Sequence, residues 1–372
     1  MPDKRQIAEN EYPLNQLYFY LTQGCNLRCR HCWLAPEYKS VENPGKYLSV
    51  DLFNQIISEA KYLGLTNVKL TGGEPLLNPD IIQIIESIKN EELGLTVETN
   101  GLLCSPEIAR QLAGCKDIFV SVSLDASKPD IHDVIRGVKG AFDRTVEGIK
   151  NLVNALLKPQ IIMSLMKQNR GEIESLVILA QKLGADSVKF NMVEPTARGE
   201  KMHVNNETLS IKDLIEIGNW VEGELADSVG MKLYYDYPAA FRPLSKMFGK
   251  DGDGFSSCGI KNILGVLSDG SYSLCGIGEN MPELVFGHVE NDSLCDIWNK
   301  TCMLKDIRNE LPNKLEGICG MCLMKNQCLG SCIAQNYYRS KSLFAPFWFC
   351  EDADKIGLFP GSRKISAHKC FL

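Results

Sequence analysis

The chain has 372 residues, of which 44% are hydrophobic and 23% charged, so it is long enough to bury a large core in two or three domains. Its formal net charge of −6 comes from interleaved acidic and basic residues, which argues against a nucleic-acid partner and against a basic membrane-surface helix. No apolar run is long enough to span a membrane, and no signal-like apolar segment follows Met1. We therefore expect a globular cytoplasmic protein without a membrane partner.

Cysteine is the compositional outlier, with 15 residues that gather in clusters. In a secreted protein this number would suggest disulfides. The missing signal peptide and the tight clusters instead favour metal ligation in a reducing compartment.

Short β-rich runs alternate with amphipathic helices over residues 14–202. Ser49 and Ser105 are typical helix N-caps, and Gly184 is typical of a helix end. The alternation predicts a parallel sheet or an open barrel, in which ligands gather beyond the carboxyl ends of the strands. The predicted strands are 17–21, 67–70, 95–99, 118–124, 161–165 and 187–191.

The composition changes twice after this region. Residues 203–250 are predicted to be helical and then loop-like around the aromatic run 234–238, and we interpret them as a bridge. The following segment is rich in Gly and Cys. The expected organisation is a core barrel at 1–202, a bridging region at 203–250, and a cysteine-rich domain with a tail at 251–372.

A CxxxCxxC motif lies directly beyond the first predicted strand, formed by Cys25, Cys29 and Cys32 and followed at once by Trp33. Three thiolates can hold three irons of a four-iron cubane and leave the fourth iron open to a non-protein ligand. Structural zinc prefers four protein ligands, and the next cysteine is Cys104. The spacing favours an iron–sulfur cluster, with zinc or coincidence as the alternatives.

A second motif, Gly72-Gly73-Glu74, follows the second predicted strand. The glycines allow backbone to approach a ligand closely, and Glu74 can accept hydrogen bonds from an ammonium group. Alone, the segment would be interpreted as a glycine turn. At the same rim as an open-iron triplet, a ligand site becomes the better interpretation.

Together these two motifs resemble those of the radical S-adenosylmethionine (SAM) superfamily, over residues 14 to about 199. The resemblance implies an α/β fold, a partial (β/α)6 TIM-like barrel. It also implies that the cysteine triplet holds a [4Fe–4S] cluster whose open iron binds SAM, which is reductively cleaved to a 5′-deoxyadenosyl radical. The residues that it places near SAM are Trp33 at the adenine, Gly72, Gly73 and Glu74 at the ammonium, Ser123 and Asp125 as polar contacts, and Arg136 at the carboxylate.

Seven further cysteines downstream are too many for core packing, although zinc knuckles could use four of them. Their order resembles the SPASM extension of radical SAM enzymes, which binds two auxiliary Fe–S clusters. The resemblance assigns Cys258, Cys275 and Cys332 to the first cluster, and Cys319, Cys322, Cys328 and Cys350 to the second.

The first auxiliary set has three cysteines, since residues 249–257 contain none. We expect either an open iron, able to bind a substrate thiolate, or recruitment of Asp251, Asp253 or a remote cysteine such as Cys370. Core packing is the preferred interpretation of the other cysteines, which are Cys104, Cys115 and the pair Cys295 and Cys302 that flanks Trp298 at helical spacing.

The resemblance implies an enzyme that abstracts hydrogen from a residue of a ribosomally made peptide and forms a thioether or C–C crosslink. Sulfatase maturases of the family usually have an acidic base at the position of Gly276, so that activity is disfavoured. A small molecule or tetrapyrrole is the alternative substrate. An iron–sulfur electron carrier is the non-enzyme alternative, for which Glu74 and the open triplet would be superfluous.

The same resemblance suggests the partners. Cys25 lies too near the start of the chain for a leader-binding extension before the barrel. We therefore expect the leader of a precursor peptide to be recognised by a separate protein or by the barrel and SPASM surfaces. A low-potential ferredoxin or flavodoxin is the expected electron donor.

Overall fold

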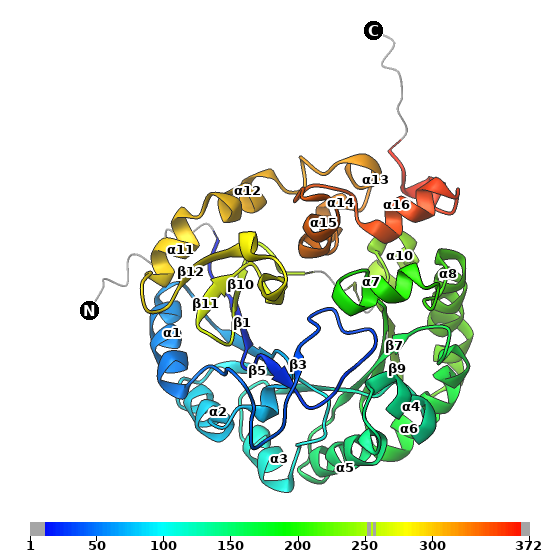
Figure 1. The fold of residues 1–372 in the computed structure, drawn as a ribbon. Coiled ribbons are helices and arrows are strands. Elements are labelled where there is room, and N and C mark those ends of the chain that lie inside the picture. Colours follow the sequence, from blue (N-terminus) through cyan, green and yellow to red (C-terminus); the bar gives the residue numbers. More distant parts are fainter. Residues whose placement is uncertain (1–11, 251–253, 256–257, 366–372) are drawn as a thin grey trace.

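Parallel strands joined by helices form the scaffold of the computed structural model, which describes residues 12–250, 254–255 and 258–365 (Figure 1). The six strands predicted for the barrel are confirmed and pair in the order β1-β4-β5-β6-β7-β8. Helices surround them, and α4, Pro129–Arg136, was not predicted. The strands are β1 Gln16–Tyr20, β4 Asn67–Thr71, β5 Gly94–Thr99, β6 Phe119–Ser123, β7 Gln160–Leu165 and β8 Ser187–Met192, and the other helices between them are α1 Val50–Tyr62, α2 Ile81–Asn90, α3 Pro106–Ala113, α5 Ala141–Asn154 and α6 Ile173–Leu183.

The predicted helix boundaries rest on local capping bonds. The hydroxyl of Ser49 accepts a hydrogen bond from the Leu52 amide at 3.3 Å, and that of Ser105 accepts one from Ile108 at 3.2 Å. Gly184 ends α6 in the left-handed conformation, with φ of 84°. These helix boundaries were therefore predictable from the sequence.

The two faces of the barrel strands differ sharply in polarity. Alternate side chains, such as Phe19 on β1, are fully buried against the outer helices. The intervening side chains lie on the opposite face, toward the barrel interior, and most are polar and half-buried, although Ile162 is apolar. They include Tyr18 and two ion-paired lysines, Lys69 with Glu98 at 2.6 Å and Lys189 with Asp236 at 3.0 Å.

Strand β9, Lys232–Tyr235, extends this sheet beside β8 and corrects the loop expected around residues 234–238. Leu233 and Tyr235 are buried while Tyr234 is half-buried, which is the alternation of a strand. Pro238 lies beyond the strand and does not interrupt it. Between β8 and β9 lie α7 Ala197–Val204, α8 Ile211–Trp220, a π-helical turn Val221–Leu225 and α9 Ala226–Ser228.

The C-terminal segment joins the other edge of the same sheet, because β10, Ile263–Val266, pairs in parallel with β1. Antiparallel pairing then adds β11, Ser271–Ser273, and β12, Val285–His288. The remaining helices complete the ring between α1 and α8 (Figure 1, yellow to red). These are α11 Leu294–Lys300, α12 Cys302–Glu310, α13 Gly317–Gly320, α14 Lys325–Cys328, α15 Ile333–Ser340 and α16 Trp348–Lys355, and the short α10, Leu244–Phe248, precedes β10.

The packing expected of Cys295 and Cys302 is wrong. Trp298 is fully buried, but both cysteines are exposed. The physical reason is that the buried side of α11 consists of Leu294, Ile297 and Trp298, which leaves Cys295 outside it, and that the helix is interrupted at Thr301 before Cys302. Cys104 and Cys115 are buried, as predicted.

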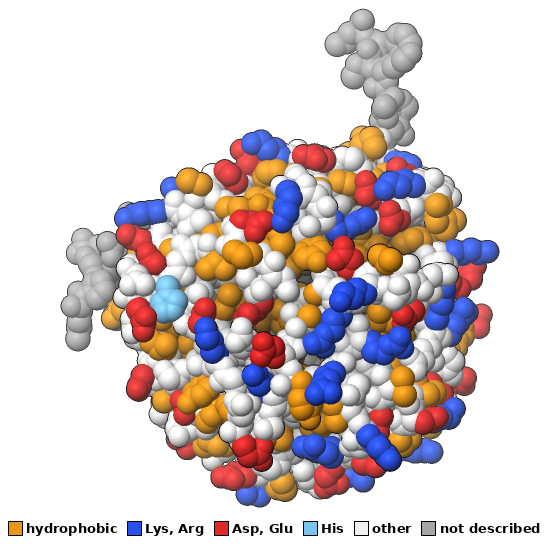
Figure 2. Space-filling model, viewed as in Figure 1, with side chains coloured by type: hydrophobic (Ala, Val, Ile, Leu, Met, Phe, Trp, Pro, Cys, Tyr) orange, Lys and Arg blue, Asp and Glu red, His pale blue; other side chains and the backbone are white. Residues whose placement is uncertain are grey.

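Charged side chains of both signs are interspersed over the face drawn in Figure 2. Among the helices of the described residues, none combines the length and the apolar composition needed to cross a membrane.

Replacing Phe53 with Ala removes a fully buried ring of α1 whose centroid lies 4.5 Å from that of Phe19. We expect a loss of about 3–5 kcal/mol in the free energy of unfolding, measured with urea on iron-free protein. Tyr62→Ala, on the same helix at 56% exposure, is the matched control and should change stability by less than about 0.5 kcal/mol. Equal losses in the two variants would contradict this assignment of the core.

Candidate functional site

The cysteine loop after β1 brings Cys25, Cys29 and Cys32 to the carboxyl end of the barrel. Its start is fixed by pairing of β2, Gly24–Cys25, with β3, Glu37–Tyr38. The described cysteines are all free thiols. Across the described ranges, no three His, Cys, Asp or Glu side chains converge closely enough to hold a single metal ion. The thiol donors of the triplet are of the kind that holds an iron–sulfur cluster.

The two glycines of the second motif pack directly against the cysteine loop. A Cβ at Gly73 would lie 2.0 Å from the carbonyl oxygen of Gly24, and Gly72 has φ of +127°. The Gly73 amide donates to Thr22 at 3.0 Å, and the Glu74 amide donates to Gly24 at 3.0 Å. Glycine is therefore required here so that two backbone segments can touch.

Glu74 is 1% exposed, and its carboxylate bonds to protein donors. Its Oε1 accepts from Thr99 Oγ1 at 2.6 Å and from the Leu76 amide at 3.2 Å, while Oε2 accepts from the Asn100 amide at 2.9 Å. Burial raises the pKa of Glu74 to about 7, although these hydrogen bonds act to lower it. The carboxylate thus clamps the turn after β5, and its contact with a ligand ammonium stays a prediction.

A cavity of about 140 Å³ opens beside this junction. Trp33 lies beside this cavity. Its carbonyl oxygen accepts a hydrogen bond from Asn280 Nδ2 at 3.3 Å, and its ring packs edge-on against the Tyr20 ring. The residues that line the cavity are Tyr20, Thr22, Gln23, Leu34, Ala35, Pro36, Glu37, Gly72, Gly73, Glu279 and Asn280.

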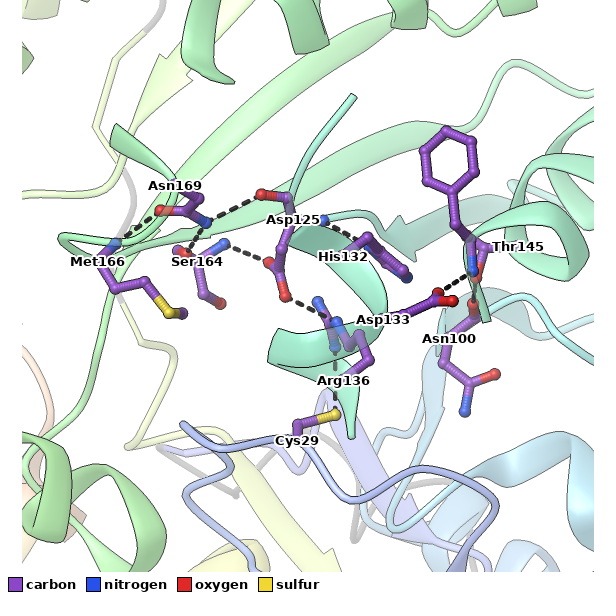
Figure 3. A network of polar contacts seen from close by, with 11 residues as sticks. Cys29, Asn100, Asp125, His132, Asp133, Arg136, Thr145, Ser164, Met166 and Asn169 are labelled. Atoms are coloured by element: carbon purple, nitrogen blue, oxygen red, sulfur yellow. Dashed lines mark hydrogen bonds and ion pairs between the residues drawn. The ribbon is translucent and has the colours of Figure 1, made fainter. Parts of the chain in front are cut away.

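A buried ion pair links β6 and α4 to the cysteine loop (Figure 3). Arg136 Nε lies 2.7 Å from Asp125 Oδ2, and the two side chains are 7% and 0% exposed. Arg136 Nη1 also donates to Cys29 Sγ at 3.6 Å. Burial opposes both charges, yet Asp125 and Cys29 raise the pKa of Arg136 while Arg136 holds the pKa of Asp125 below its usual range. Arg136 therefore faces a thiol that the sequence assigned to the cluster.

The neighbours of Asp125 fix its orientation. The Ser164 amide donates to Oδ1 at 2.9 Å, and Asn169 Nδ2 donates to the Asp125 carbonyl at 2.9 Å. The Asp125 amide donates to His132 Nδ1 at 3.1 Å (Figure 3). Ser123, two residues earlier at the end of β6, is half-buried at the same rim. Asp125 is therefore held in place beside Arg136 by its neighbours, whereas His132 Nε2 is buried without a hydrogen-bond partner among the described residues.

The four cysteines predicted for the second auxiliary cluster surround one site. Cys319, Cys322, Cys328 and Cys350 line a common cavity with apolar walls that include Leu315, Met324 and Phe359. Backbone amides already point at two of the sulfurs, from Phe347 to Cys319 and from Met324 to Cys322, both at 3.3 Å. The chemistry of this donor set fits a cysteine-ligated cluster.

The cysteines predicted for the first auxiliary cluster lie at a second cavity, of about 290 Å³, lined by Cys258 and Cys332 together with Glu194. Burial raises the pKa of the Cys332 thiol well above its usual range, and the nearby Cys275, Glu194 and Cys258 raise it further. Cys275 is not among the residues that line the cavity, but it lies close enough to Cys258 and Cys332 to act on them electrostatically. Asp251, Asp253 and Cys370, named above as possible ligands, lie outside the described residues.

The chain is similar to known proteins in both sequence and fold. The model of the Radical SAM superfamily matches residues 19–200. The AdoMet-dependent heme synthase of Methanosarcina barkeri is 32% identical over 331 residues, which cover 85% of this chain and 90% of that protein. The chain belongs to the radical SAM superfamily. Radical SAM domains bind a [4Fe–4S] cluster and SAM, and this enzyme also has a SPASM domain, an iron–sulfur cluster-binding domain matched at residues 258–323, which binds auxiliary clusters.

Two other radical SAM proteins are similar over most of this chain. Mycofactocin maturase MftC of Mycobacterium tuberculosis is 25% identical over 354 residues, which cover 93% of this chain and 85% of that protein. The crystal structure of Streptococcus suis SuiB bound to precursor peptide SuiA superposes with a TM-score of 0.72 at 19% identity, covering 91% of this chain and 76% of that one. The radical SAM fold with a SPASM domain is therefore confirmed.

Sequence reasoning underrated two residues of this radical SAM site. Asn100 follows β5 and would be expected to form a turn, but its Nδ2 also donates to Asn26 Oδ1 at 2.7 Å and reaches Cys25 Sγ at 3.9 Å. Arg198, which follows β8, donates to the Cys29 carbonyl at 3.2 Å. Position beyond a strand end was the available signal for both. Their partners depend on the folded loop.

Replacing Arg136 with Gln leaves Asp125 as an unpaired buried charge. We expect a loss of about 3–5 kcal/mol in unfolding free energy, and a smaller combined loss than the sum of single effects when Asp125→Asn is added. Arg170→Gln breaks an exposed pair with Asp213, 3.2 Å apart at 54% and 29% exposure, and should cost at most about 1 kcal/mol. Urea unfolding of iron-free protein measures the two single variants, the double variant and Arg170→Gln. Additive losses would show that Arg136 and Asp125 are not energetically coupled.

His132 predicts an acid-sensitive step. Burial, aided by Arg136, lowers its pKa from 6.5 to about 4, so the folded ring stays neutral while an unfolded chain takes up a proton. Stability should therefore fall as pH drops from 6.5 to 4, by about 3 kcal/mol from this group. His132→Asn should remove that part of the slope in urea titrations across this range. Parallel curves for the variant and the parent would show that His132 does not titrate this way.

Proposed function

We propose that this enzyme is a peptide maturase that abstracts a hydrogen atom from a residue of a ribosomally made precursor peptide, leading to a thioether or C–C crosslink. When bound, the [4Fe–4S] cluster and SAM supply the 5′-deoxyadenosyl radical. The chain's own residues would hold the cluster at Cys25, Cys29 and Cys32 and position the peptide in the barrel. The observation that carries the proposal is the polar inner face of the barrel strands.

This inner face suits a peptide better than an apolar macrocycle. Lys69 lies 4.8 Å from the centroid of the Tyr18 ring and pairs with Glu98, and across the barrel Lys189 pairs with Asp236. Peptide amides and polar side chains can exchange hydrogen bonds with such groups. A tetrapyrrole is a broad apolar ring edged with carboxylates, which would require apolar walls and unpaired cations.

The position after Cys275 also bears on the reaction class. A Cβ at Gly276 would lie 2.1 Å from Tyr20 Cε1, and Tyr20 is 4% exposed. Tyr20 thus occupies the space that an acidic base at this position would need, which supports disfavouring sulfatase maturation.

The comparisons support the substrate class from two directions. MftC, at 25% identity, is named as a maturase. SuiB, with the same fold, holds a precursor peptide. We extend this to the partners, proposing a separate leader-recognition protein and a ferredoxin or flavodoxin as electron donor.

Oxidation of a tetrapyrrole is the second candidate function. It is favoured by one observation, the 32% identity to the heme synthase of M. barkeri. The two candidates differ in the product that they release.

Reconstituted enzyme should be incubated anaerobically with SAM, dithionite and each short peptide encoded beside its gene, in deuterated form. We expect deuterium in 5′-deoxyadenosine and a peptide lighter by two hydrogen atoms, with neither change in a Cys25→Ala control. A parallel incubation uses iron coproporphyrin as the tetrapyrrole. Unchanged peptide masses, with loss of carbon dioxide from the porphyrin, would replace the first candidate with the second.

A further inference from the structure

The cavity at Cys258 and Cys332 contains a carboxylate that no step so far uses. Glu194 follows β8, Cys258 precedes β10 and Cys332 precedes α15, so three different segments line the cavity, and Cys275, after β11, lies near Cys332. Three of the four residues are thiols. Cysteine-ligated cubanes have four ligand positions, so this set is one short.

Glu194 is held rigidly but is incompletely satisfied. Its carbonyl oxygen accepts from the Thr196 amide at 2.8 Å, and a Cβ at Gly199 would lie 2.0 Å from that oxygen, so the loop is tightly packed. Beside Trp348 and Gln335, which bond to each other from Nε1 to Oε1 at 3.1 Å, lies the carboxylate of Glu194. Its Oε2 is nevertheless buried and has no partner within the described part of the chain. An unsatisfied buried acceptor is unfavourable, and a bound ligand would remove that cost.

The other carboxylate that lines this cavity already has a partner. Asp236 pairs with Lys189 at 3.0 Å and is 37% exposed. Of the two carboxylates among the described residues at the cavity, Glu194 is thus the one with a buried oxygen that lacks a hydrogen-bond partner. Carboxylate oxygen is an accepted ligand of iron, harder than thiolate and easier to displace.

We propose that Glu194 is the fourth protein ligand of the first auxiliary cluster, completing the set of Cys258, Cys275 and Cys332. The proposal rests on the assignment of these three cysteines to one cluster and is independent of the substrate. Its consequence is that the resting cluster has no open iron. A substrate thiolate would have to displace the carboxylate before it could bind there.

The test first removes the spectroscopic signal of the cluster at Cys25, Cys29 and Cys32. In a background of Cys25→Ala, Cys29→Ala and Cys32→Ala, the auxiliary clusters alone contribute to the electron paramagnetic resonance spectrum. Glu194→Gln keeps the shape and hydrogen bonding but is a poor iron ligand. We expect it to alter the spectrum of one auxiliary cluster and to lose iron from it, while Asp236→Asn leaves both spectra unchanged.

Added cyanide should bind the cluster of the Glu194→Gln protein and shift its spectrum, but not that of the background protein. Identical spectra, iron contents and cyanide responses in the two proteins would overturn the proposal.

A measurement without substitution at Glu194 guards against a variant that fails to fold. The background protein is labelled with ¹³C at glutamate carboxylates and its reduced clusters are examined by electron–nuclear double resonance. A ¹³C coupling to one auxiliary cluster is expected. Its absence would overturn the proposal whatever the variants show, and either result leaves the peptide-maturase proposal to its own mass measurement.

Discussion

The parallel pairing of β1 with β4 on one side and β10 on the other is the constraint on which the rest of the structure depends. It places the loops after β1 and β4 at one rim, where Gly73 touches Gly24 and the cysteine triplet is held. It also attaches the C-terminal segment to the barrel edge, so that Cys258 and Cys275 flank the hairpin beginning with β10. Residues separated by more than two hundred positions thereby face a common interior.

Much of this arrangement was predictable because its signals are local. Six strands followed from β-rich runs, two helix starts from Ser49 and Ser105, and the cluster site from the spacing of Cys25, Cys29 and Cys32. These patterns encode backbone geometry or ligand count within a few residues. Strand β9 was missed because its aromatic alternation ends close to Pro238, which was given too much weight as a loop signal.

The remaining site could not be predicted because its partners are non-local. No sequence pattern shows that Arg136 bonds both Asp125 and Cys29, or that the Glu74 carboxylate turns toward Thr99 and Asn100. The failure at Cys302 has the same origin, since helical spacing carries no information once Thr301 interrupts the helix. Spacing identifies residue types capable of chemistry, and tertiary packing decides which atoms they present.

The cysteine triplet and the first auxiliary cysteine set are two of the three predicted cluster sites. They differ in the charge of the side chains beside them. At the cysteine triplet, a buried arginine donates toward Cys29, and Asp125, held by Ser164, fixes the direction of that guanidinium. A cation beside a thiolate stabilises extra negative charge and so favours the reduced state of a cluster there. At the first auxiliary set, the neighbouring group is the carboxyl of Glu194, and burial raises the pKa of Glu194 to about 8. Because Arg136 is fixed at the end of α4 and Glu194 lies just beyond β8, the fold itself sets this difference in electrostatic environment, whatever substrate occupies the polar interior between them.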